Sequence, residues 1–323
     1  AVKAVSTKRR QVVVASYVCG FIVFIASILI APYFVAGDQE LYIRNYNTLA
    51  TLDIFDGYIQ YFALTGSVEP GYYLIVWLAS HAQIDKGLLM AIVNSLFAVL
   101  SMRLFASWGA NTIVASLIVT TNFYFVSMFF ALEKLKFGMF FLVIALLMSN
   151  QRYRRLLAAV VSVLCHFQIT IVFASFIFAR LISRYQRILR GKIQKSIIVS
   201  IALGAAIAVV FWERILRKIL IYQDLISGSI LLELVNMFAF LLISLFYTKQ
   251  RIQVVSIFFV LFVAAALVGD QRINILGFYA ATFYLVKSKH GINIANAILI
   301  IYFAIKAIFF IMNIIETGNG YAT

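Results

Sequence analysis

Apolar runs long enough to cross a membrane recur along almost the whole of this 323-residue chain. Hydrophobic residues make up 64% of it and charged residues only 12%, a composition that soluble globular domains do not have. A helix needs about 20 apolar residues to cross a bilayer, and it satisfies its own backbone there without water. The sequence therefore predicts an all-α polytopic integral membrane protein, with residues 1–323 forming a single transmembrane domain.

Two of the apolar runs do not fit a simple span. Gly71–Ile84 and Leu156–Ser183 are either plain spans or broken, re-entrant helices, which gives about nine to eleven membrane helices in all. The runs expected to cross completely are Val12–Tyr33, Gly87–Arg103, Thr112–Leu132, Phe137–Asn150, Ser196–Trp212, Ile230–Tyr247, Ile252–Val268, Ile273–Val286 and Ile292–Met312.

The positions of the basic residues favour one topology over the other. Cytoplasmic loops carry an excess of Lys and Arg, and the basic N-terminus is expected in the cytoplasm. If both uncertain runs dip in and return, Arg103 and the cluster Arg152–Arg155 are cytoplasmic together with the basic loop 180–195. If both are plain spans, these cations face outside. The re-entrant topology fits the charge rule better, and it makes the region around Glu133 external.

The external segments carry acids, tyrosines and cations. In the acidic and aromatic loop 34–70, Asp38, Tyr42, Asn45 and Tyr46 recur at a spacing that places them on one helical face. Carboxylates that accept hydroxyl hydrogen bonds and tyrosine rings that pack on sugar faces would suit a glycan. An interfacial helix with an ordinary aromatic belt is the alternative. Residues 213–229 form a second external segment, an amphipathic surface helix.

Glu69-Pro70-Gly71 stands at the edge of an apolar run, in a chain with only two prolines. Ionisable groups at such places are costly and usually serve a function. Pro70 at the first helical position, with Glu69 as a helix cap accepting backbone N–H bonds, is the simpler interpretation. His166 lies at membrane depth, where it is either a site residue or a hydrogen-bonded structural histidine.

Two short external segments concentrate charge: Glu133-Lys134-Leu135-Lys136 and Asp270-Gln271-Arg272. Clustered cations can hold a diphosphate and stabilise it as a leaving group. Loop charges that pair with each other are the alternative.

Several function classes are excluded by pattern. The chain has no phosphate-binding or dinucleotide fingerprint and no cluster with metal-ligand spacing, so neither a cofactor nor a metal is expected. The net charge of +15 comes from short basic loops that suit anionic lipid headgroups, not from a nucleic-acid surface.

These residues carry a resemblance to a known family. Gly37-Asp38 with Tyr42 and Tyr46, followed by Glu69-Pro70-Gly71-Tyr72-Tyr73-Leu74, resembles the start of EpsG-family, Wzy-type polysaccharide polymerases. The likeness continues through Phe129–Lys136 and Leu157–Phe167, up to about Phe178, and beyond that only in layout. Glu133, Lys134 and Lys136 replace the Arg-Gln that the family usually shows, and Gln168 stands where a serine is common.

The resemblance implies a metal-independent glycosyltransferase with a GT-C-like membrane architecture. Such an enzyme joins oligosaccharide repeat units carried on undecaprenyl diphosphate at the outer face of the bacterial cytoplasmic (inner) membrane, for O-antigen, capsule or exopolysaccharide. Its partners would be the lipid-linked substrate, membrane lipids and a chain-length regulator. The implied roles are Glu69 or His166 as the base, Lys134, Lys136 and Arg272 for the diphosphate, and Asp38, Tyr42, Tyr72 and Glu133 for the sugar.

Two other functions remain open at the level of sequence. One is a lipid-linked oligosaccharide flippase, which would need a polar path through the bundle. The residues that could line such a path are Lys306, Glu233, Asn94 and Asn236. A membrane acyltransferase that modifies surface glycan is the other, although a clear intramembrane His-x-x-Asp motif is lacking.

Overall fold

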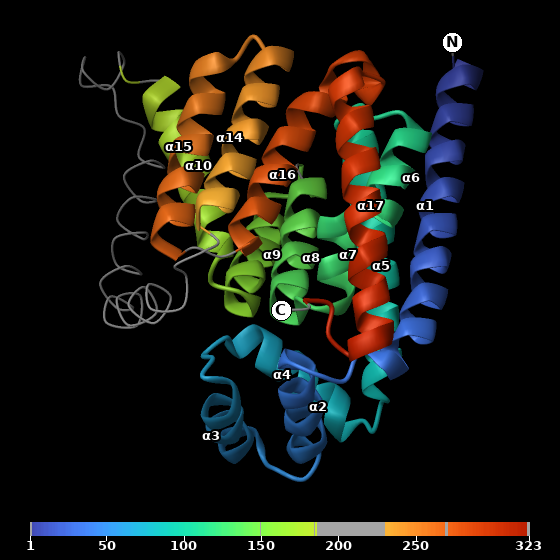
Figure 1. Cartoon of the computed structure of the whole chain (residues 1–323), viewed down its shortest axis with the longest axis vertical. Coiled ribbons are helices and arrows are strands. Elements are labelled where there is room, and N and C mark those ends of the chain that lie inside the picture. Colours follow the sequence, from blue (N-terminus) through green and yellow to red (C-terminus); the bar gives the residue numbers. More distant parts are fainter. Residues whose placement is uncertain (1, 149, 184, 186–229, 269–270, 322–323) are drawn as a thin grey trace. The chain divides into compact units, whose positions relative to one another are not determined.

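The computed structural model describes residues 2–148, 150–183, 185, 230–268 and 271–321 (Figure 1). Within these ranges the secondary structure is helical and no strand is present. The expected span Ser196–Trp212, the amphipathic segment 213–229 and most of the basic loop 180–195 lie outside the described residues.

The chain divides into two compact units. The first comprises residues Ala1–Ile169 and Lys289–Thr323, and the second comprises Thr170–Ser288. The single transmembrane domain spanning residues 1–323 stays a prediction. The helices of the first unit are α1 (Val2–Ile30), α2 (Asp38–Leu49), α3 (Ile54–Thr65), α4 (Pro70–His81), α5 (Lys86–Ser107), α6 (Thr112–Thr121), α7 (Phe123–Phe130), α8 (Glu133–Leu147), α9 (Arg152–Cys165) and α17 (Ile294–Thr317), with short 3-10 turns at Ala31–Tyr33 and Lys289–Gly291.

The second unit is a smaller helical bundle. Its described helices are α10 (Ile169–Ser183), which begins at the boundary, α14 (Ile230–Tyr247), α15 (Arg251–Val268) and α16 (Gln271–Lys287). α14 packs against both α15 and α16, and the ring of Phe178 in α10 stacks on Phe259 of α15 at 5.6 Å. Gly277 lets α16 approach α14 closely, because a Cβ there would lie 2.6 Å from the sulfur of Met237.

Several described helices are suited to a membrane, as the composition predicts. Arg10–Tyr33, Lys86–Ser107 and Lys289–Thr317 are each long and apolar enough to cross one. A fourth span results if α6 and α7, bent by 50°, are taken together. Ile169–Ser183, Leu231–Tyr247 and Arg251–Leu267 are shorter apolar helices. The fold is therefore all-α and compatible with a membrane protein.

The expected span Thr112–Leu132 is interrupted by a bend. The helix stops at Asn122, whose backbone is extended and whose side-chain oxygen accepts the N–H of Tyr124 at 2.9 Å. A side chain that caps the next helix competes with continuation of the previous one, so a single polar residue splits the apolar run into α6 and α7.

α1 and α5 run antiparallel, and this fixes the two ends of the first unit. Arg103 near the end of α5 contacts Ser16 and Tyr17 of α1, whereas Asn94, half-way along α5, bonds Ser27 near the end of α1. The chain thus leaves α1 and enters α5 at the same end, and the short helices α2–α4 lie together there (Figure 1). We call this the α2–α4 end.

α4 does not carry the chain across the unit. Its 12 residues measure about 18 Å, against roughly 30 Å for a bilayer core. α8 and α9 form an antiparallel hairpin, in which the hydroxyl of Ser162 donates to the carbonyl of Gly138 at 2.6 Å. α9 ends at Cys165 and α10 begins at Ile169, so the apolar run Leu156–Ser183 is broken at His166, as the sequence predicts.

Candidate functional site

Glu69 occupies the N-cap position of α4, and Pro70 is at the first position of the helix. Within the part of the chain that the structure describes, the Glu69 side chain makes no capping hydrogen bond to α4, so the expected backbone contacts are wrong. Its carboxylate instead receives three other groups: Nδ1 of His166 at 2.8 Å, Nζ of Lys134 at 3.6 Å and the hydroxyl of Ser67. Glu69 is only 4% exposed, so this is a buried carboxylate held by three donor groups.

His166 reaches Glu69 because the chain is extended at the break between α9 and α10. Two glycines allow the surrounding helices to approach. A Cβ on Gly71 of α4 would lie 2.9 Å from the backbone nitrogen of Cys165, and a Cβ on Gly138 of α8 would lie 2.8 Å from the Cβ of His166. The glycine of the Glu69-Pro70-Gly71 motif therefore serves the contact between α4 and the end of α9.

A second buried acid lies in the same unit. Glu133, at the first position of α8, is 2% exposed and pairs with Nζ of Lys86 at 2.7 Å. The hydroxyl of Tyr72 donates to its other oxygen at 2.7 Å. Lys86 also donates to the side-chain oxygen of Gln39 at 3.0 Å. Glu133 thus ties α8 to α4, α5 and α2.

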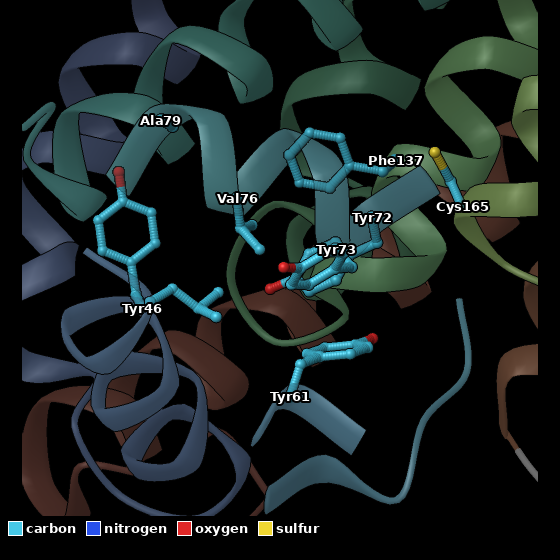
Figure 2. Close-up of a cluster of buried hydrophobic side chains, with 9 residues drawn as sticks. Tyr46, Tyr61, Tyr72, Tyr73, Val76, Ala79, Phe137 and Cys165 are labelled. Atoms are coloured by element: carbon cyan, nitrogen blue, oxygen red, sulfur yellow. The ribbon is translucent and has the colours of Figure 1, made fainter. Parts of the chain in front are cut away.

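Tyrosine rings connect the two acids. Tyr42 has Nζ of Lys86 at 5.7 Å and Nζ of Lys134 at 5.5 Å from its ring centre, and Lys134 is 5.6 Å from the ring of Tyr61. Figure 2 shows the ring of Tyr61 close to those of Tyr72 and Tyr73, with Phe137 beside Tyr72 and Cys165 at the end of α9. The two carboxylates and their lysine partners are therefore next to an aromatic part of the core of this unit.

The charge of Glu69 is held by its neighbours. Burial alone raises the pKa of this carboxyl group. The hydrogen bond and charge of His166, the charge of Lys134 and the Ser67 hydroxyl outweigh burial and lower the pKa to about 2. The carboxylate is consequently ionised at every physiological pH.

The structure brings together most of the side chains that the sequence singles out. These are Glu69, His166, Lys134, Glu133, Tyr42 and Tyr72. Asp38 lies in the first turn of α2 and is exposed. Arg272 lies in the first turn of α16, in the second unit, and its diphosphate role stays a prediction.

Lys136 is placed differently from what its expected role requires. It is fully buried, and its ammonium group donates to the carbonyl of Phe129 at 3.1 Å. The side chain of Asn94 donates to the same carbonyl at 2.9 Å. A cation near the carboxyl end of a helix is favoured by the helix dipole. Lys136 therefore supports the end of α7, whereas Lys86 and Lys134 both lie near the ring of Tyr42.

Three contributors were missed from the sequence: Lys86, Gln39 and Ser67. Lys86 begins an apolar span, where a lysine normally serves as an interfacial anchor, and nothing in its neighbours indicates Glu133, 47 residues away. Ser67 stands two residues before Glu69, and this closeness was the one available signal.

Among the described residues, no group of three or more His, Cys, Asp or Glu side chains could hold a metal ion. Comparisons with family models, curated proteins and solved structures return no match to this chain. Its function is therefore inferred from the chemistry of the site. A fixed carboxylate, two ammonium groups near the ring of Tyr42 and further tyrosine rings suit a substrate that has both hydroxyl groups and an anionic leaving group.

Proposed function

We propose that this protein is a membrane glycosyltransferase that polymerises oligosaccharide repeat units carried on a polyprenyl diphosphate, as the resemblance to Wzy-type polymerases implies. The observation that carries the proposal is the buried Glu69–His166 pair with Lys134 beside it. Acid, histidine and cation come from segments up to 97 residues apart, and holding them in a poorly solvated place is costly without a function.

The reaction needs an oriented hydroxyl group and a stabilised leaving group. A hydroxyl of the acceptor sugar attacks the anomeric carbon of the donor, a new C–O bond forms, and the bond to the diphosphate oxygen breaks. The diphosphate leaves with the bonding electron pair, and Lys134 and Lys86 neutralise its charge. The hydroxyl proton passes to Glu69.

The low pKa of Glu69 restricts how it takes part. A carboxylate with a pKa of about 2 is a weak base, so it does not remove the proton from a free sugar hydroxyl. It accepts a hydrogen bond that orients the hydroxyl, and takes the proton late, when the forming C–O bond has made the oxygen acidic. Tyr42, which is partly exposed, offers an aromatic face to the sugar.

The positions of basic residues support the orientation that the proposal requires. Arg103 and Lys289 lie at the end of the first unit opposite α2–α4, since the 3-10 turn at Lys289–Gly291 bonds to Gly109 and Asn111 just beyond α5. The positive-inside rule places that end in the cytoplasm. The α2–α4 end, with Glu69, would then face the periplasm, where Wzy-type enzymes act.

The decisive experiment replaces Glu69 by glutamine. Glu69→Gln keeps the shape and removes the negative charge, so we expect chain extension to stop and lipid-linked single units to accumulate at an unchanged protein level. The control is Glu40→Gln, an exposed acid of α2 in the same part of the molecule. Extracted glycan is sized by gel electrophoresis. A polymer of normal length in Glu69→Gln would refute the proposal.

The same experiment addresses the flippase alternative. Loss of a flippase leaves no exported repeat units, whereas loss of a polymerase leaves single units on the cell surface. In the structure, Asn94 bonds Ser27 and Phe129, and Lys306 lies 4.6 Å from the ring centre of Phe123. Two of the four candidate path residues are thus engaged in contacts between helices.

A further inference from the structure

Both ring nitrogens of His166 are engaged by side chains of this chain. Nδ1 lies 2.8 Å from Oε1 of Glu69, and Nε2 lies 2.9 Å from Oε1 of Gln168. A carboxylate only accepts hydrogen bonds, so Nδ1 carries a proton. The amide of Gln168 can present either its oxygen or its NH2 group, and therefore satisfies Nε2 whether or not that nitrogen is protonated.

The ring has little freedom to leave this arrangement. His166 is 4% exposed and lies in an extended stretch between two helices. Gly138 of α8 packs directly against its Cβ. A ring held on both nitrogens and packed at its root has no lone pair free for a substrate hydroxyl.

Glu69, in contrast, keeps acceptor capacity, because a carboxylate has about four acceptor sites and three donors engage it here. His166 occupies Oε1, whereas Oε2 lies 3.6 Å from Nζ of Lys134, whose side chain is 13% exposed. Ser67 donates to the same Oε2. The Oε2 side of the pair is thus where an incoming hydroxyl would meet the site.

We propose that His166 is a positioning residue that fixes Glu69 through Nδ1, that Gln168 holds the ring in this orientation through Nε2, and that His166 does not exchange protons with the substrate. This inference rests on the proposed function for its activity readout. It decides between the two candidate bases in favour of Glu69, and it gives a role to the glutamine that replaces the serine common in the resembling family.

Amide side chains test which nitrogen matters. The NH2 group of asparagine can occupy the position of Nδ1, and that of glutamine the position of Nε2. We expect His166→Asn to polymerise within about tenfold of wild type, because the bond to Glu69 survives. His166→Gln and His166→Ala should lose about 100-fold or more, as expected when a reacting group shifts by about 1 Å.

Gln168 offers a matched pair of variants. Gln168→Glu keeps an acceptor for Nε2 and should retain most activity. Gln168→Met has a similar length but no strong acceptor, and should lose about tenfold. Activity of wild type and His166→Asn should follow the same curve between pH 6 and 8. The titratable or charged groups that face the pair are Lys134 from α8, Cys165 from α9 and Tyr61 from α3.

Thermal unfolding of the purified variants separates this inference from the proposed function. We expect His166→Asn to melt close to wild type, and His166→Gln and His166→Ala to melt clearly lower. If His166→Asn folds like wild type but is as inactive as His166→Ala, then Nε2 acts on the substrate and the inference is overturned. If Glu69→Gln polymerises normally, the proposed function fails. In that case the melting temperatures alone test the positioning role of His166. Equal melting temperatures of the three His166 variants would overturn it.

Discussion

Glu69 combines burial, a negative charge and contacts that all depend on that charge. Its interaction with His166 and Lys134 exists only while the carboxylate is ionised. Removing one partner of a buried pair leaves the other charge uncompensated, which commonly costs about 3–5 kcal/mol. At the scale of single residues, the site is therefore sensitive both to substitution and to pH.

The pH dependence has a definite sign. The folded protein holds the pKa of Glu69 at about 2, below the ordinary value of 4.5, so the folded state favours the ionised form. This contribution, about 3 kcal/mol, is fully present above pH 4.5 and is lost as the pH falls from 4.5 to 2. We expect the melting temperature of the wild type to fall over this range, and that of Glu69→Gln to fall less. Parallel curves for the two proteins would contradict the assignment.

The pair of Lys86 and Glu133 allows a double-mutant cycle. Lys86→Met and Glu133→Gln each remove one member of the ion pair and leave the other charge without its partner. Each should therefore lower the melting temperature strongly. The double variant should lose less stability than the sum of the losses in the two single variants, because neither charge of the pair remains. Tyr72→Phe, which removes only one hydrogen bond, is the milder control. Strict additivity would mean that Lys86 and Glu133 do not interact in solution.

Residue identity alone could reveal some of this cluster but not the pairing within it. Glu69 and His166 stand out because charge is rare in apolar surroundings, and the cluster does contain both. That Lys86 rather than Lys136 would lie near the ring of Tyr42 with Lys134 could not be foreseen, because both are lysines next to apolar runs. That choice depends on where α7 ends, since Lys136 is taken up by the carbonyl of Phe129.

Among the elements, the contact between α4 and the end of α9 is the most constrained. Gly71→Ala would place a methyl group 2.9 Å from the backbone of Cys165, and backbone cannot rotate aside as a side chain can. We expect α4 to shift and Glu69 to separate from His166, with a loss of polymerisation of about 100-fold.

The control for this change is Gly87→Ala, in the first turn of α5. There the nearest atom is 3.1 Å away and belongs to the flexible side chain of Asp85. Sized glycan from both variants, together with their melting temperatures, provides the measurement. Equal activity of Gly71→Ala and Gly87→Ala would show that the helix contact is not needed for the site.

Helix boundaries follow from the sequence more closely than helix shape does. The predicted run Ile230–Tyr247 ends at the same residue as α14, and the run from Gly87 begins one residue after the start of α5. Hydrophobicity sets these limits. The bend at Asn122 was missed because hydrophobicity does not distinguish a polar residue inside a span from a cap between two helices.

Across the first unit as a whole, acidic side chains gather toward the α2–α4 end. Arg103 and Lys289 lie at one end. Acidic side chains at the α2–α4 end include those of Asp53 and Asp85. The positive-inside rule then predicts which end faces the cytoplasm. The re-entrant topology inferred from the sequence requires the same arrangement, because it keeps Gly71–Ile84 from crossing.

Cysteine labelling in intact cells measures this orientation directly. Ser107→Cys and Asn150→Cys should resist an impermeant thiol reagent, whereas Thr51→Cys between α2 and α3 should react. The native thiols of Cys19 and Cys165 are buried and give little background. Ready labelling at residues 107 and 150 with protection at residue 51 would show that the orientation in the membrane is the opposite one, with Glu69 on the cytoplasmic side.

The discontinuous first unit has a consequence for biosynthesis. Every residue of the Glu69–His166 cluster has been synthesised once the ribosome passes Gln168, but α17 follows only after the whole second unit. α17 covers the start of α7, where Phe303 meets Tyr124 and Phe310 meets Phe123. A nascent chain therefore contains all the charged residues of the cluster before α17 has been synthesised. At that stage the aromatic residues at the start of α7 have not yet been covered by α17. α17 must therefore fold back onto helices that were synthesised more than one hundred residues before it.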